Sequence, residues 1–592
     1  MSRKNVLSRR QFATGVTASA TAAILTACGG GARGESGTPA TKPPVPTANG
    51  ATTATTATIP ATITSASSVA APQIGTAGAV PSVNLVDGQI PSGIIGVPDA
   101  YTKPPTKFFQ ATPNIPGKGG TVKVFSILYG TPPVRRSENR YWQELEKRLG
   151  VTWEPTLAPS VSFGEKSAAV AAGGDLGDLF YLNPDQNADA QRQLIQQGAF
   201  ADLTPYLSGD GLKEFPNLAR YPDYLWKNVA FKGKIYGVPK PVLRGGNIGF
   251  YRSDWLQKLH LSYPKNADDT YNMLVAFSKN HPGGNGQETF GATSSGPNPW
   301  NVLVWGGIFR APNEWRLNPD GTLRRNLETD EDRQAVEFAH RLYTGGAFHP
   351  DAAGMNSDQE RDLWRSARLG IHSEGFIAFW GNKGPITYMH QNVPDAAIDG
   401  FIPPGFDSGH GVTNNLSGFF GFTAVPTKVG KDKERTKELL RILDYLAAPF
   451  GSEEYNFIYY GVDGWDNDVQ PDGSRIVNDQ GRSELGGLVY MMQSEYNFYY
   501  PGAPGDAERA QAIAKQSLAL GIDNPTYGLS SATNNAKGAE LTQLRIDRTT
   551  AFVTGREPMS AYDQYIKDWR SRGGDTIRKE FEQAIKEAKS AM

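Results

Sequence analysis

Hydrophobic and polar positions follow regular periods from residue 119 onward. Residues 121–128 predict a strand, because apolar side chains recur at every second position along one face. Residues 139–149 predict a helix, since their apolar residues recur at intervals of three and four. A strand at 151–154, a helix around 165–172, and a turn with a buried strand at 173–182 follow. This alternation predicts an α/β fold with parallel strands and crossover helices.

Helical periods also mark the second half of the chain. Ser253 can cap one helix, and Asp268 or Asp269 can cap the next, because short polar side chains accept hydrogen bonds from the first free backbone N–H groups. Four longer helices are predicted at 330–343, 434–447, 506–520 and 575–589.

The N-terminus has the pattern of an export signal. A basic head precedes a short apolar stretch that is too short to span a bilayer. Residues 8–12 (Ser-Arg-Arg-Gln-Phe) resemble a twin-arginine signature, and residues 25–28 (Leu-Thr-Ala-Cys) resemble a bacterial lipobox. We expect a signal peptide at 1–27 and a lipid anchor on Cys28. The alternative is that Cys28 is an unmodified thiol and the arginine pair is coincidental.

The next segment, 28–118, predicts a flexible tether. Ala, Gly, Pro, Ser and Thr dominate it up to residue 82, and no aromatic residue occurs between Phe12 and Tyr101. Such a composition cannot bury enough apolar surface to offset the entropy of ordering. Residues 83–118 are transitional, because apolar patches appear among the prolines and glycines.

Composition excludes several classes of protein. Lys and Arg total 59 and Asp and Glu total 60, so the net charge is -1 and a nucleic-acid partner is not expected. The one cysteine allows neither an intrachain disulfide nor a cysteine-based metal site. We expect no cofactor and no metal.

No nucleophile elbow, phosphate-binding loop or kinase signature is present. Residues 29–34 satisfy G-x-G-x-x-G, but they follow no predicted strand, so this match does not indicate a dinucleotide-binding site. Catalysis by a pair of carboxylates stays open, with structural ion pairs as the competing interpretation. The acidic residues near aromatic ones are Glu374, Asp463, Asp466 and Glu495.

Aromatic and Gly-rich segments are the most distinctive feature of the globular part. They lie at 298–307, 376–382, 461–466 and 496–500. A flat ring matches the apolar face of a pyranose, and neighbouring polar side chains can satisfy the sugar hydroxyls. Trp and Tyr also fill protein cores, so packing is the competing interpretation for each aromatic residue.

Five segments, in order, resemble one known family. They are Gly173–Leu179 (like G-D-x-P-D, with Gly177 in place of Pro), Gly233–Pro239 (G-K-x-Y-G-x-P), Tyr251–Leu256 (Y-R-x-D-W-L), Tyr460–Trp465 and Tyr562–Ile566. Together with the lipobox, they make residues 119–592 similar to the family 1 extracellular solute-binding lipoproteins of bacterial ABC importers, of the LipO-like type.

The resemblance implies a two-lobed, periplasmic-binding-protein-like α/β fold of class II type, with a hinge and an inter-lobe cleft. The implied boundaries assign 119–240 and 403–455 to lobe 1, and 241–402 and 456–592 to lobe 2. Closure of the lobes around a ligand is the motion expected of such a fold.

The resemblance also implies a non-catalytic, monomeric protein on the outer face of the cytoplasmic membrane. It would bind a carbohydrate, most simply an oligosaccharide, and deliver it to the permease subunits of an ABC transporter. The alternatives are a secreted glycan-active enzyme and a surface lipoprotein that binds peptide or protein. The implied ligand-binding residues are Tyr129, Asn183, Asp185, Arg244, Trp300, Trp305, Glu374, Phe376, Trp380 and Trp465.

Some relatives in this family carry a calcium loop of the D-x-N-x-N-G type. The corresponding residues here, 281–289, lack the acidic first ligand and the second side-chain ligand. Because calcium takes six to eight oxygen ligands, we expect a metal-free turn at this place.

Overall fold

The computed structural model describes residues 86–184, 193–245, 248–283, 286–294, 299–373, 389–390, 393–501, 503 and 505–590. All of them lie in one compact unit, Ser68–Met592. The predicted signal peptide, Cys28 and most of the predicted tether lie outside the described residues. Within the described part, no helix is both long and apolar enough to cross a membrane.

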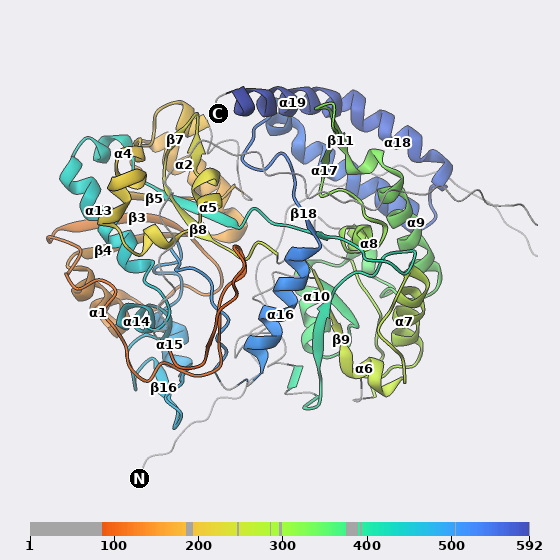
Figure 1. Cartoon of the computed structure of the whole chain (residues 1–592), viewed down its shortest axis with the longest axis horizontal. Helices are drawn as coiled ribbons and strands as arrows, with labels where there is room; N and C mark the ends of the chain where they lie inside the picture. Colours follow the sequence, from red (N-terminus) through yellow and green to blue (C-terminus); the bar gives the residue numbers. More distant parts are fainter. Residues whose placement is uncertain are drawn as a thin grey trace, which may run out of the picture. The chain divides into compact units, whose positions relative to one another are not determined.

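Lobe 1 is built on a five-stranded sheet (Figure 1). Its strands are β3 (Thr121–Leu128), β4 (Thr152–Pro159), β5 (Leu179–Leu182), β8 (Val238–Pro241) and β15 (Phe419–Ala424), in the order β4-β3-β5-β15-β8. β3 pairs in parallel with β4 and β5, whereas β15 runs antiparallel to both β5 and β8. The predicted parallel strands are confirmed, and β15 adds one reversed strand.

The first of the two crossover helices of lobe 1 begins and ends where the sequence provides caps. Asn139 accepts a hydrogen bond from the backbone N–H of Trp142 at 2.7 Å and starts α1 (Arg140–Leu149). Gly150 ends α1 in the left-handed region, which glycine adopts without a Cβ penalty. α2 (Phe163–Gly173) then leads to β5. These helices and α13 (Lys433–Leu446) cover a core that includes Trp153, Phe180 and Leu443.

Lobe 2 has a smaller antiparallel sheet. β9 (Gly249–Arg252) lies between β12 (Ile371–Ser373) and β13 (Ile398–Phe401). The helix α17 (Ala532–Val553) contacts α9 (Asp330–Thr344), α18 (Tyr562–Trp569) and α19 (Asp575–Ser590) (Figure 1). The longer helices of this lobe are α6 (Ser253–Lys258), α7 (Ala267–Lys279), α8 (Val302–Phe309), α9 (Asp330–Thr344), α10 (Ser357–Arg365), α16 (Asp506–Ala519), α17 (Ala532–Val553), α18 (Tyr562–Trp569) and α19 (Asp575–Ser590).

Two lobe boundaries differ from the prediction. Residues 403–418 stay with lobe 2, because β14 (Thr413–Asn414) pairs with β18 (Gly521–Ile522). Conversely, the segment after residue 455 stays with lobe 1. It contains α14 (Glu453–Tyr460), β16 (Asn467–Val469), β17 (Arg475–Val477) and α15 (Asp479–Glu484). Phe457, Leu488 and Met491 belong to the lobe 1 core, so the chain returns to lobe 2 only after this segment.

The predicted tether is also too long, because residues 86–118 pack against the globular body. We call them the N-terminal strap. Val97 is buried in a lobe 2 core cluster, and the backbone N–H of Tyr101 donates to Phe498 O at 2.8 Å. Further along, the carboxylate of Glu454 in lobe 1 accepts from the backbone N–H groups of Ala111 and Thr112. The strap therefore contacts both lobes.

Candidate functional site

The lobe 1 sheet has one edge at which several strands end together. The carboxyl ends of β3, β4, β5 and β8 and the amino end of β15 meet there, because β15 is antiparallel to its neighbours. The connection from β3 leads outward to β4, and the chain then returns to β5 on the other side of β3. Ligands of open α/β sheets bind outside such a switch point.

Three partly exposed aromatic rings gather at this edge. Tyr129 follows β3 and is 43% exposed, Phe420 lies near the start of β15, and Tyr490 lies in a turn after α15. The ring of Tyr129 lies 5.2 Å from that of Tyr490 and 6.4 Å from that of Phe420, measured between centroids. We call these three residues the aromatic platform. Buried Tyr181 supports it through an edge-on contact with Tyr490.

Two predicted polar residues lie at the ends of strands of the same sheet. Asn183 directly follows β5 and is fully buried. Arg244 follows β8, and its guanidinium is held by both carboxylate oxygens of Asp523 at 2.9 Å. Its charge also lies over the ring of Tyr224, 5.6 Å from the centroid. Arg244 is therefore fixed by contacts on both sides.

Trp465 is 40% exposed, and a hydrogen bond from its indole N–H holds the side chain in place. Its indole N–H donates to Glu484 Oε1 at 2.9 Å, and the other carboxylate oxygen of Glu484 accepts from the backbone N–H of Tyr141 at 2.8 Å. Arg140, the first residue of α1, lies over the indole ring at 5.3 Å. Because α1 begins after the loop that follows β3, Trp465 lies toward the edge of the sheet that carries the platform.

Two predicted ligand contacts belong instead to the lobe 2 core. Trp300 and Trp305 are 1% and 0% exposed. The Trp300 indole N–H donates to Thr550 Oγ1 at 3.1 Å, and its ring meets Phe348 edge-on. The Trp305 indole N–H donates to Trp300 O at 2.8 Å. Both side chains are satisfied internally, so core packing, the competing interpretation, describes them.

Four further predicted site residues lie outside the described residues: Asp185, Glu374, Phe376 and Trp380. In the 281–289 segment, His281 Nδ1 accepts from the backbone N–H of Thr289 at 3.1 Å. Within the described ranges, no group of three or more His, Cys, Asp or Glu side chains is placed to hold a metal ion.

The acidic residues considered for catalysis that the structure describes, Asp463, Asp466 and Glu495, are ion-paired or buried. Arg475 binds both oxygens of Asp463, at 2.7 and 2.8 Å. Asp466 is buried, and burial raises its pKa to about 6, with neighbouring Glu484 adding to the shift. Burial also raises the pKa of Glu495, which lies 3.6 Å from Arg220. Ion pairing and burial account for these carboxylates without a reaction.

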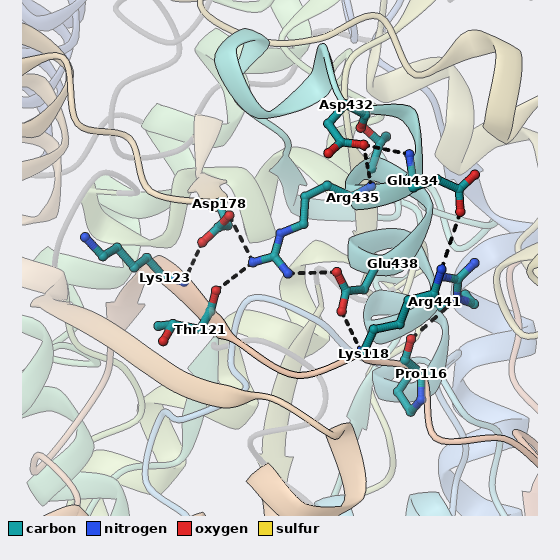
Figure 2. Close-up of polar contacts among 11 residues, drawn as sticks. Pro116, Lys118, Thr121, Lys123, Asp178, Asp432, Glu434, Arg435, Glu438 and Arg441 are labelled. Atoms are coloured by element: carbon teal, nitrogen blue, oxygen red, sulfur yellow. Dashed lines mark hydrogen bonds and ion pairs between the residues drawn. The ribbon is translucent and has the colours of Figure 1, made fainter.

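Two of the resembling motifs also have structural roles. Asp178, in the first, accepts from the backbone N–H of Lys123 at 2.8 Å and from Arg435 at 3.1 Å, as Figure 2 shows. Arg435 also reaches Glu438, which accepts from the backbone N–H of Lys118 (Figure 2). This network lies at the amino ends of the parallel strands, opposite the platform.

In the Y-R-x-D-W-L motif, Arg252 and Asp254 form a two-point ion pair at 2.7 and 2.8 Å. The Arg252 side chain is fully buried and also lies over the Trp255 ring at 4.6 Å. This motif joins β9 to α6 and organises lobe 2.

Sequence reasoning missed Phe420, Tyr490 and Lys240, a buried lysine beneath Tyr490. Phe420 and Tyr490 are ordinary aromatic residues in their local sequence. Only the fold brings these two residues beside Tyr129, so the periodicity of the sequence does not predict that they lie there.

Comparisons with known proteins agree with this architecture. No family model matches the chain. The polygalacturonan/rhamnogalacturonan-binding protein YtcQ of Bacillus subtilis is 24% identical over 497 residues, covering 78% of this chain and 91% of YtcQ. Lipoprotein LipO of the same organism is 25% identical over 492 residues, covering 80% of this chain and 94% of LipO.

Among solved structures, the Streptococcus pneumoniae ABC-transporter substrate-binding protein FusA, in complex with kestose, has a similar fold. Its TM-score is 0.59 at 18% identity, covering 80% of this chain and 100% of FusA. The chain is therefore similar in sequence to YtcQ and LipO over most of its length and has the two-lobed fold of FusA.

Proposed function

We propose that this protein captures an oligosaccharide on the aromatic platform and delivers it to the permease subunits of an ABC transporter. The observation that carries the proposal is the group of three partly exposed rings at the switch point of the lobe 1 sheet. Flat rings stack on the apolar faces of sugars, and a preformed group of rings binds with little ordering cost.

The relatives support the same substrate class. YtcQ is named for binding polygalacturonan and rhamnogalacturonan, and FusA was solved with kestose. These homologues are binding proteins rather than enzymes. We extend this to the present chain and propose a non-catalytic role, because the described carboxylates nearest the aromatic segments are engaged in ion pairs or buried.

The remaining contacts of the ligand are proposed from the sequence. We propose Asn183, which follows β5, and Trp465 as contacts at the platform edge of lobe 1. We also propose Arg244, which lies in the segment that follows β8. We propose Asp185, Glu374, Phe376 and Trp380 as further contacts.

Lipoprotein and substrate-binding homologues support a membrane-anchored, extracellular location. We propose that the anchor is a lipid on Cys28, that residues 1–27 are a signal peptide of the twin-arginine type, and that the protein acts as a monomer. Mass analysis of the membrane-extracted protein tests the first two points. A mature chain that begins at an acylated Cys28 is expected, and an intact residue 1–27 segment contradicts them.

The substrate class is tested by titrating the full chain with kestose, galacturonan oligomers and a mannose-rich glycan. The readouts are melting temperature and intrinsic fluorescence, followed by mass analysis of the recovered glycan. A ligand at 100 times its Kd stabilises the folded state by about 2.7 kcal/mol. A shift with intact glycan supports capture, whereas shortened glycan supports the enzyme alternative.

The platform is tested with Tyr129→Ala, for which loss of one stacking ring should weaken binding about tenfold. Tyr129→Phe keeps the ring and should retain most of the affinity. Phe406→Ala is the matched control, because Phe406 is 45% exposed but lies in lobe 2, outside the platform. Equal affinity of the Tyr129→Ala and Phe406→Ala variants would remove Tyr129 from the site.

A further inference from the structure

A buried lysine lies directly beneath the aromatic platform. Lys240, in β8, is 4% exposed. Its ammonium donates a hydrogen bond to Tyr490 O at 2.7 Å. The same nitrogen lies 3.7 Å from the centroid of the Tyr490 ring. The Lys240 ammonium therefore contacts both the backbone and the side chain of Tyr490, a residue of the platform.

This arrangement is unfavourable for the lysine itself. An ammonium loses most of its hydration on burial, and no carboxylate forms an ion pair with Lys240 in the part of the chain that the structure describes. Burial alone lowers its pKa to about 7. An apolar side chain of similar length would fill the same space without this cost. Packing therefore does not account for a charge at this position.

The segment that carries Tyr490 needs an external support. It follows α15 and consists of turns and extended chain up to an isolated bridge at Phe498, so no strand ladder holds it. Thr423 Oγ1 binds Met491 O at 2.8 Å, and Lys240 binds the preceding carbonyl. These two side chains, from β15 and β8, attach the segment to the sheet around Tyr490, while Trp153 donates to Leu488 O at 3.0 Å and Tyr221 donates to Gln493 O on either side.

The position of Tyr490 determines the shape of the platform. Its ring contacts Tyr129 at 5.2 Å, Phe420 at 6.4 Å and Tyr181 at 6.4 Å. Opposite Lys240 in the sheet is Gly421, whose missing side chain leaves room for the Tyr181 hydroxyl. A shift of Tyr490 would thus change all three ring contacts.

We propose that Lys240 is a positioning residue for ligand binding, whose ammonium fixes Tyr490 through a carbonyl hydrogen bond and a cation–π contact and so sets the geometry of the platform. The proposal rests on the proposed function for its ligand, but its effect on Tyr490 does not depend on any ligand.

Because Lys240 is charged, the proposal predicts that ligand affinity depends on pH. The cation–π contact is lost when the ammonium loses its proton. The titratable groups near it are the phenols of Tyr490, Tyr181 and Tyr129, and burial raises the pKa of Tyr490 far above its ordinary value. No charged neighbour contributes to the shift of Lys240. Affinity for a neutral sugar should therefore fall as the pH rises from 6 to 8.5.

The test compares the full chain with its Lys240→Met variant by amide hydrogen exchange without ligand. Faster exchange confined to peptides covering 485–493 is expected, because local opening reports lost local contacts. Lys234→Met is the control, since Lys234 is an exposed lysine of β7 (Lys234–Ile235) paired with Asp202. Unchanged exchange in the Lys240→Met variant overturns the proposal, whether or not a sugar binds.

The second measurement is affinity for kestose at pH 6 and pH 8.5, or for the neutral glycan that gives the largest melting shift. The variant should bind about tenfold more weakly at pH 6 and show no pH dependence, while Lys240→Arg should recover part of the affinity. Equal affinity of the unmodified chain and the Lys240→Met variant at pH 6 overturns the proposal. Failure of every glycan to bind overturns the proposed function instead, and the exchange experiment still decides the role of Lys240.

Discussion

Replacing Glu484 by Gln tests how the Trp465 loop is held. Glu484 is fully buried, and its carboxylate accepts hydrogen bonds from the Trp465 indole, the Gln480 amide and the backbone N–H of Tyr141. Donors thus approach both oxygens. A glutamine has one oxygen and one NH2 group, so at least one donor would face another donor.

The size of the effect follows from these contacts. A hydrogen bond to a charged group contributes about 1.5–3 kcal/mol, and a buried donor left without an acceptor costs about 1–3 kcal/mol. Part of the loss is recovered by the remaining amide oxygen. We expect Glu484→Gln to lower the free energy of unfolding by about 2–4 kcal/mol and to release Trp465 from its position.

Denaturant unfolding measures the stability change, and intrinsic fluorescence reports the environment of the tryptophans. Glu434→Gln is the control, because Glu434 and its partner Lys118 are both exposed and such pairs contribute about 0–1 kcal/mol. If Glu484→Gln changes stability no more than this control, the three-donor account of the Glu484 carboxylate is refuted.

Three further outcomes are expected. Asp254→Asn should lower the free energy of unfolding by about 3–5 kcal/mol in denaturant titrations. The reason is that the substitution leaves the buried Arg252 guanidinium without its counter-charge. A loss below about 1 kcal/mol contradicts this expectation. Deleting 86–118 should lower the melting temperature, whereas deleting 29–85 should not, and equal melting curves would show that the strap adds no stability. Burial raises the pKa of Asp444 to about 7, so its contribution to stability is full below about pH 4 and is lost as the pH rises to about 7. Melting measured from pH 4.5 to 8 should show this loss, and Asp444→Asn should remove it.

The sequence predicts best where local pattern and topology agree. The strand β3 and the helix α1 are confirmed, because one face of each is apolar and Asn139 and Gly150 mark the helix ends. The 22-residue helix α17 was not predicted. Its buried residues are sparse for its length, and Gly538 lies within it, so the usual signals of a helix are weak.

The sequence proposes only part of the aromatic platform, for a physical reason. Tyr129 is among the proposed residues, because a loop after a parallel strand is expected to face the ligand side of the sheet. Phe420 and Tyr490 could not, since they reach the platform through an antiparallel strand and an irregular turn. Trp300 and Trp305 are buried in the lobe 2 core, and the sequence alone does not distinguish aromatic rings that pack in a core from rings that contact a ligand.

The residues that carry the family resemblance and the residues that form the platform are different sets. Asp178 ties the amino ends of strands to α13, and Arg252 with Asp254 joins β9 to α6, so these motifs maintain the two lobes. Tyr129, Phe420 and Tyr490 lie outside all five motifs. Under the proposed function, substitutions on the platform would change the ligand without disturbing these motifs. The proposed separation is consistent with the relatives: YtcQ is named for binding polygalacturonan and rhamnogalacturonan, and the FusA structure with a similar fold holds kestose. Under the proposed function, the platform and its support by Lys240, and not the motifs, determine which sugar binds.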